Sequence, residues 1–157
     1  MNFDINIKLK LKWVILVCLW IFILNFSNLF SQDLLNVSSN TTLYISPNTT
    51  MKVNGDANLE ANSSFLLGNN SYVELTGDLT NSSGSFSTSS GTFVLGGSFF
   101  NSGYFASGTG WFLLNGSSSQ TFSSASEMII DYLLLNKSAG NLVLFADLRI
   151  LSFLRFI

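Results

Sequence analysis

The chain has 157 residues, of which 47% are hydrophobic, 14% aromatic and only 10% charged, with a formal net charge of −2. Globular proteins ordinarily carry about a quarter charged residues, so the polar surface here must come largely from Ser, Thr, Asn and Gly. The small negative charge argues against a nucleic-acid partner, which would need a basic stripe. One cysteine, Cys18, and no histidine exclude an intrachain disulfide, a Cys/His zinc site and a histidine-based triad.

Residues 1–31 are predicted to be a secretory signal peptide that forms an N-terminal signal helix. Three lysines supply a positive start, and the apolar run that follows, residues 13–24, has the length of a signal-peptide core. That run is short for a membrane span. We expect cleavage near Ser31 or Gln32. The alternative is an uncleaved anchor over residues 13–30, through which alone the chain would contact a membrane.

Residues 32–50 are expected to form an N-terminal lead-in and cap. Leu43 and Ile45 begin an alternating apolar pattern that is typical of a strand. Pro47 ends it, because proline cannot donate a hydrogen bond to a β ladder.

A repeat dominates residues 51–126. Four apolar-x-apolar-x-Gly units end at Gly55, Gly77, Gly97 and Gly116, which lie 22, 20 and 19 residues apart. A period near twenty residues is typical of a solenoid, in which each coil stacks on the previous one. Since side chains alternate across a strand, the two large apolar residues of each unit share one face. We predict that this face points inward; its residues are Met51, Val53, Val73, Leu75, Phe93, Leu95, Phe112 and Leu114.

The second half of each coil repeats as well. An Asn-Ser motif recurs before Phe86 and Phe105, which are therefore further inward positions, with Phe65 or Leu67 as the equivalent one coil earlier. Each coil then contains two or three short strands, and equivalent strands pair in parallel about 4.8 Å apart. The aligned glycines are expected to form corners at which φ can be positive, because glycine has no Cβ to oppose that conformation.

Residues 127–157 are predicted to add further β rungs and to be truncated. The apolar run at 128–135 favours a strand, and a short buried helix over 127–135 is the alternative. Gly140 turns the chain, and strands are expected at 142–144 and 148–150. Nothing polar caps residues 152–157, so we expect a fragment, a truncated gene product or a docking face.

Two segments carry a resemblance to a known family: NSGYFASGTGWFLLNGSSSQTF at residues 101–122 and YLLLNKSAGNLVLFADLRI at residues 132–150. They resemble the repeat region of large secreted β-solenoid proteins of Bacteroidetes-type bacteria, over roughly residues 40–150. In that family a Gly- and Phe-rich coil ending in Gln precedes a rung with the motif Asn-Lys-Ser-x-Gly. The resemblance implies export to the cell surface, often by the type IX route with a C-terminal sorting domain. This sequence shows no match to that domain, which supports the expectation of a fragment.

Two aspartates are a candidate Ca²⁺ site. Asp56 and Asp78 each follow an aligned glycine and are expected to stack about 5 Å apart on adjacent coils, with Glu74 nearby. Carboxylate oxygens are the ligands that Ca²⁺ prefers. The equivalents in later coils are Ser98 and Ser117, so the carboxylates do not continue, and the simpler interpretation is solvated surface charge. We predict no cofactor.

An outward row of residues is a candidate glycan platform. Thr50, Tyr72, Thr92 and Trp111 precede the inward pair of each coil and are expected to point outward. Tyr72 and Trp111 could stack on sugar rings, because aromatic side chains combine an apolar face with a polar tip. The alternative is that they pack across rungs or against a neighbouring domain.

Two further features have simple interpretations. After residue 31, eight asparagines, Asn81 among them, open Asn-x-Ser/Thr glycosylation triplets, and chance explains these in a chain so rich in Asn, Ser and Thr. Motifs of a nucleophile elbow, a phosphate loop or a metalloprotease are missing from the sequence. Lys52 is the sole basic residue of the repeat. We therefore predict that the protein is not an enzyme.

The features together predict an all-β protein, a short right-handed parallel β-solenoid with coils of about 20 residues. The predicted function is that of an exported structural or adhesive segment, a stiff spacer that is secreted or held on the outer surface of a Gram-negative bacterium. A carbohydrate-binding surface module is the alternative, and a membrane-anchored envelope protein is a third class. Expected partners are cell-surface glycans or envelope proteins.

Overall fold

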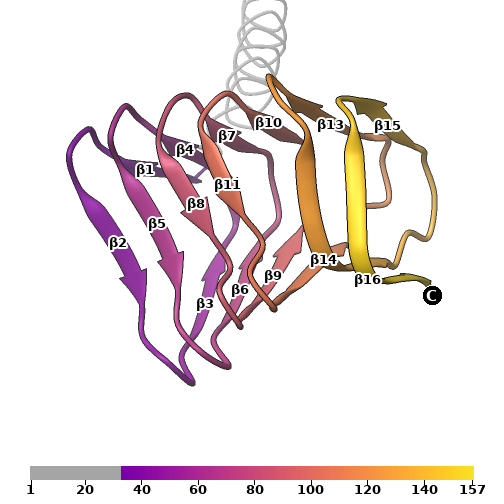
Figure 1. Ribbon diagram of the computed structural model, residues 1–157, viewed down its shortest axis with the longest axis horizontal. Helices are drawn as coiled ribbons and strands as arrows, with labels where there is room; N and C mark the ends of the chain where they lie inside the picture. The colour runs from indigo at the N-terminus through magenta and orange to yellow at the C-terminus, as the bar shows by residue number, and fades with distance from the viewer. Residues whose placement is uncertain (1–32) are drawn as a thin grey trace, which may run out of the picture. The chain divides into compact units, whose positions relative to one another are not determined.

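The computed structural model describes residues 33–157, which form a parallel β-solenoid (Figure 1). The predicted signal peptide, its helix and Cys18 lie outside these residues. Every strand pair between residues 33 and 157 is parallel. Within the same residues, no helix has the length and apolar character needed to cross a membrane.

Three sheets form the walls of the solenoid. Sheet A contains β1 (Asp33–Val37), β4 (Gly55–Leu59), β7 (Leu79–Asn81), β10 (Phe99–Asn101), β13 (Gln120–Ser124) and β15 (Leu142–Phe145). Sheet B contains β2 (Thr42–Ile45), β5 (Ser64–Leu67), β8 (Ser85–Ser87) and β11 (Tyr104–Ala106). Sheet C contains β3 (Thr50–Val53), β6 (Tyr72–Leu75), β9 (Thr92–Leu95), β12 (Trp111–Leu114), β14 (Met128–Leu135) and β16 (Leu148–Phe156). Sheets A and C are six-stranded, which gives six coils, and β1 to β3 make the first of them.

The register of sheet C confirms the predicted repeat. Val73 lies beside Phe93, and Phe93 beside Phe112, in successive coils. Six of the eight residues predicted to point inward are buried. The other two, Met51 and Val53, belong to the first coil, where they are half-buried and pack against the core.

A stack of phenylalanine rings fills the interior between the sheets. In sheet B, Phe65, Phe86 and Phe105 follow one another in register, as the repeated motif predicts. The Phe86 ring lies 4.8 Å from the Phe93 ring, centroid to centroid. Burying each such side chain contributes about 1.5–3 kcal/mol, and only when the next coil covers it. Coils therefore stabilise one another, and a single coil would not be stable alone.

The corners correct one prediction. Left-handed φ angles occur at Asn40 (62°), Asn48 (60°), Asn62 (57°), Asn70 (55°), Ser89 (48°), Gly108 (56°) and Gly140 (74°). Three of the four aligned glycines, Gly77, Gly97 and Gly116, do not have positive φ, so the prediction for them is wrong. Asparagine accepts the left-handed conformation because its short polar side chain can hydrogen-bond locally. At four corners asparagine, and not the aligned glycine, is therefore the residue with positive φ.

The aligned glycines serve close stacking instead. A Cβ on Gly97 would lie 2.4 Å from the carbonyl oxygen of Gly77, and a Cβ on Gly116 would lie 2.1 Å from that of Gly96. Side-chain carbon does not approach backbone this closely, so only glycine fits against the preceding coil at these corners.

Gly116→Ala is therefore expected to lower the free energy of unfolding by about 1–3 kcal/mol, because the corner must shift to admit the methyl group. Chemical denaturation measures the change. Ser117→Ala, at the exposed neighbouring position, is the matched control and should fall within about 0.5 kcal/mol of the parent. Equal stability of the two variants would show that the coils do not stack this closely at the corner.

The last two coils omit the sheet B strand. The second half of β14 continues sheet C, with Tyr132 beside Trp111. Its first half runs past β11 without joining sheet B. β16 pairs along β14 with an irregularity between Ile130 and Tyr132. The strand predicted at 128–135 is confirmed, and the alternative helix over 127–135 is wrong.

Candidate functional site

The two aspartates of the candidate Ca²⁺ site lie at one corner and accept hydrogen bonds from the next coil. Asp56 Oδ1 accepts from the Asp78 backbone N–H (2.8 Å), and Asp78 Oδ1 accepts from the Ser98 N–H (2.6 Å). Ser98 Oγ continues the series by accepting from the Thr121 N–H (3.0 Å). The series thus satisfies backbone donors between coils, which is a structural role that serine fills as well as aspartate.

Glu74 lies apart from this corner. It sits on the outer face of sheet C, where Oε1 accepts from Lys52 Nζ at 3.0 Å. The structure therefore brings Asp56 and Asp78 together but pairs Glu74 with Lys52 of the preceding coil. Across residues 33–157, no three metal-ligating side chains are clustered.

The candidate glycan row lies on the outer face of sheet C, as predicted: Thr50, Tyr72, Thr92 and Trp111 are adjacent in register in successive coils. Trp111 is 37% exposed, but Thr92 lies between it and Tyr72. Its ring packs instead on Tyr132 (centroids 5.0 Å apart, 42° between planes) and edge-on to Phe153 (5.8 Å, 80°). The sequence pattern does not predict Tyr132 and Phe153 as partners of Trp111. Extending the coil repeat past Phe122 would have placed Tyr132 one coil after Trp111. Tilted rings that contact one another fit cross-rung packing better than a flat platform.

A ladder of buried amides joins sheets A and B. Asn81 has no exposed surface; its Nδ2 donates to Asn101 Oδ1 (2.8 Å) and its Oδ1 accepts from the Gly84 N–H (2.8 Å). Asn101 Nδ2 donates in turn to the Gly103 carbonyl (3.1 Å). The glycosylation triplet at Asn81 therefore has a structural role, since its amide is enclosed and fully used.

Gln120 and Lys137 form a second network between coils. Gln120 is 1% exposed; its Nε2 donates to the Gly97 carbonyl (2.6 Å), and its Oε1 accepts from Lys137 Nζ (2.7 Å). Lys137 Nζ also donates to the Gly116 carbonyl (2.9 Å). Partial burial lowers the pKa of Lys137. The spacing between Gln120 and Lys137 thus has a structural reason, because together the two side chains donate hydrogen bonds to backbone carbonyls of neighbouring coils.

The Glu60 carboxylate accepts three hydrogen bonds on the surface. Its Oε1 accepts from Asn36 Nδ2 (2.9 Å), and its Oε2 accepts from the backbone N–H (2.9 Å) and Oγ (3.1 Å) of Ser39. The Asn36 hydrogen bond, followed by those from Ser39, lowers the pKa of Glu60 below its ordinary value of 4.5. The lowered pKa means that the folded state favours the ionised carboxylate.

A pH dependence follows from this contact. Since the folded pKa of Glu60 is lowered, its stabilisation is fully present above the unfolded value of 4.5 and is lost as the pH falls through the folded value. The difference in melting temperature between the parent and Glu60→Gln should be largest near neutral pH and shrink below pH 4.5. Asn36→Ala, which removes the main cause, should reduce the same difference. A difference that is constant with pH contradicts the assignment.

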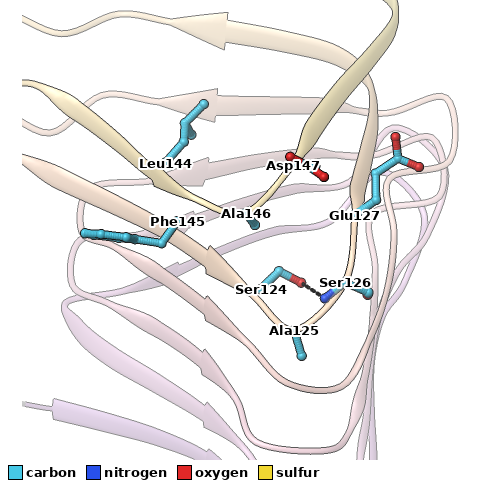
Figure 2. A pocket seen from close by; sticks show the side chains of 8 residues that line it. All are labelled: Ser124, Ala125, Ser126, Glu127, Leu144, Phe145, Ala146 and Asp147. Atoms are coloured by element: carbon cyan, nitrogen blue, oxygen red, sulfur yellow. Dashed lines mark hydrogen bonds between the residues drawn. The ribbon is translucent and has the colours of Figure 1, made fainter.

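A shallow hollow of about 460 Å³ lies where the fifth and sixth coils turn. Figure 2 shows that Glu127 and Asp147 reach its rim from these successive turns, while the Phe145 ring points away. Arg149 Nε donates to Glu127 Oε1 at 3.2 Å. No sequence pattern predicts this pair of carboxylates, because both residues follow the point at which the repeat spacing changes.

Comparison of the chain with protein-family models, with curated proteins and with solved structures finds no match. Function is therefore inferred from the sequence pattern and from the geometry of residues 33–157.

Proposed function

We propose that the protein is an exported, non-catalytic structural or adhesive segment of a bacterial cell-surface protein, in which the solenoid acts as a stiff spacer. The observation that supports this is the unbroken parallel pairing of sheets A and C through six coils. Such a ladder satisfies the backbone of every coil through its neighbours and resists bending. Envelope proteins and cell-surface glycans are the partners that such a segment would space or contact.

Two finer features belong to the same proposal. Residues 1–31 act as a signal helix that directs export. The coil is right-handed, since parallel crossover connections take that hand in about 98% of cases. The resemblance to repeat regions of Bacteroidetes-type secreted proteins supports both the export and the outer-surface location.

The state of the mature N-terminus tests export directly. The full chain is expressed in a Gram-negative host, fractionated and analysed by intact-mass spectrometry. We expect a species that begins near Gln32 in the exported or surface fraction. A chain that retains residues 1–31 and fractionates with membranes would favour the membrane-anchored envelope protein. An intact chain in the cytoplasm would overturn the proposal.

Carbohydrate binding by outward aromatics, Tyr72 and Trp111, is the second candidate function. The exposed part of Trp111 favours it. Trp111 is the sole tryptophan after residue 31, so the fluorescence of the mature chain reports on this position alone. A saturable change on adding soluble polysaccharides would support glycan binding at sheet C. An unchanged emission spectrum would count against glycan binding and favour a packing role for Tyr72 and Trp111.

A further inference from the structure

Sheet B stops at β11, although the solenoid continues beyond it. The next segment along the stack is the first half of β14, which does not join sheet B. A hollow of about 300 Å³ lies between the two strands and is lined by Phe105 of β11 and Ile129 of β14, with Tyr104 and Glu127 also contributing. Figure 1 shows β14 beside β11 at this place in the stack.

The backbone of β11 presents one residue to the hollow. The Tyr104 N–H donates to the Gly84 carbonyl (2.9 Å), and the Ala106 carbonyl accepts from the Thr88 N–H (3.2 Å). Tyr104 and Ala106 therefore turn their polar groups toward β8. Because these groups alternate in direction along a parallel strand, Phe105 turns its N–H and C=O the other way, toward β14.

The backbone of β14 presents a matching residue. The Met128 N–H donates to the Asp147 carbonyl (2.8 Å), on the side of β16. By the same alternation, Ile129 turns its N–H and C=O toward β11. Phe105 and Ile129 thus face the hollow with two donors and two acceptors, and no strand pairing satisfies them within residues 33–157. Phe105 and Ile129 are themselves half-buried, and backbone groups at such positions pair with protein, with ordered water or with a ligand.

One end of the hollow is closed. The Asp131 N–H donates to Ser107 Oγ at 3.0 Å, which links β14 to β11 two residues beyond Ile129 and Phe105. An extended peptide could not run through a space that is closed in this way, whereas a compact group could enter from the open side. The volume is at the lower limit for a small-molecule site, about 300–1,000 Å³, and suits one ring.

The rim adds an aromatic ring and a carboxylate. Tyr104 is 66% exposed, and Glu127 keeps its carboxylate beside the opening with Oε1 paired to Arg149. Hydroxyl groups both donate and accept, so a hydroxyl-rich ring can satisfy Phe105, Ile129 and Glu127 while its apolar face meets Tyr104. We propose that this hollow binds a single sugar ring, such as the terminal unit of a glycan. The spacer function does not depend on it, and Trp111 takes no part.

The test is a titration of the ¹⁵N-labelled mature chain with methyl glycosides of glucose, galactose, mannose and N-acetylglucosamine, followed by NMR. At least one glycoside should shift the amides of Phe105 and Ile129 saturably. Tyr104→Ala should then weaken binding about tenfold, and Glu127→Gln should weaken it too. Arg149→Gln, which removes the ion pair but keeps the Glu127 carboxylate, should leave binding in place.

Tyr44→Ala is the matched control, because Tyr44 is a 55% exposed tyrosine on β2 of the same sheet, away from the hollow. It should leave binding unchanged. The proposal is overturned if no glycoside shifts Phe105 and Ile129, or if Tyr104→Ala and Tyr44→Ala behave alike. It is also overturned if glycylglycine shifts the same amides at concentrations where the glycosides do not, since the site would then take peptide.

Discussion

Phe99→Ala is expected to lower the free energy of unfolding by about 3–5 kcal/mol. Phe99 is fully buried in sheet A. Its ring lies 5.4 to 6.0 Å, centroid to centroid, from four other rings, those of Phe86, Phe105, Phe112 and Phe122. Truncation removes apolar area and leaves a cavity that the rigid strands on either side cannot close. Since small domains are stable by only about 5–15 kcal/mol, urea denaturation should show a large shift of the midpoint.

Phe100→Ala is the control that makes this result specific. Phe100 is the next residue along β10 and is 39% exposed, because alternate side chains of a strand point to opposite faces. Its truncation should change stability by less than about 1 kcal/mol. Similar losses for the two variants would mean that the strand does not separate an interior from an exterior.

Asn81→Ala is expected to cost about 2–4 kcal/mol, because it removes the fully buried first amide of the ladder. Asn101 Oδ1, the Gly84 N–H and the Tyr104 carbonyl each lose a hydrogen bond. An unsatisfied buried group costs about 1–3 kcal/mol. Hydrogen exchange should locate the effect, with the Gly84 amide losing protection first.

Asn69→Ala is the matched control for this variant. Both asparagines open an Asn-x-Ser triplet, but Asn69 is exposed and its Oδ1 accepts only from the Ser90 hydroxyl (2.7 Å) among residues 33–157. Its replacement should change the unfolding free energy by less than about 1 kcal/mol. If Asn81→Ala were no more costly than Asn69→Ala, the buried amide would not stabilise the stack.

The repeat could be predicted from the sequence where the strands are long enough to show alternation. The pairs before Gly77, Gly97 and Gly116 give the register of sheet C directly. In sheet A the middle strands have three residues each, so Leu79 and Phe99 carry too short a pattern to be recognised as inward. Only the pairing of β7 and β10 with their neighbours shows that these residues belong to strands.

The corners were harder to predict because two residue types can serve there. Asn54-Gly55 and Asn115-Gly116 direct attention to glycine as the turn residue. In the structure, asparagines such as Asn48 and Asn70 take the left-handed conformation, and the glycines allow coils to approach. A sequence pattern does not separate these two uses of glycine, since both require only the missing Cβ.

At the candidate sites too, the sequence predicts which residues are neighbours but not which atoms they contact. The sequence placed Asp56 and Asp78 on adjacent coils, as the structure does, but it could not show that a backbone N–H of the next coil lies against each carboxylate. The hollow at Phe105 and Ile129 left no sequence signal at all. It arises because one strand of sheet B is missing, which is a property of pairing and not of residue type.

The most direct test of the stacked interior is a set of through-space NMR contacts among Val73, Phe93 and Phe112. These residues are adjacent in successive coils of sheet C and almost fully buried, with the two rings 5.4 Å apart. We expect nuclear Overhauser effects from the Val73 methyls to the Phe93 ring and from that ring to Phe112, together with slow exchange of their amides. Side chains without mutual contacts, or amides that exchange as fast as exposed ones, would contradict the solenoid.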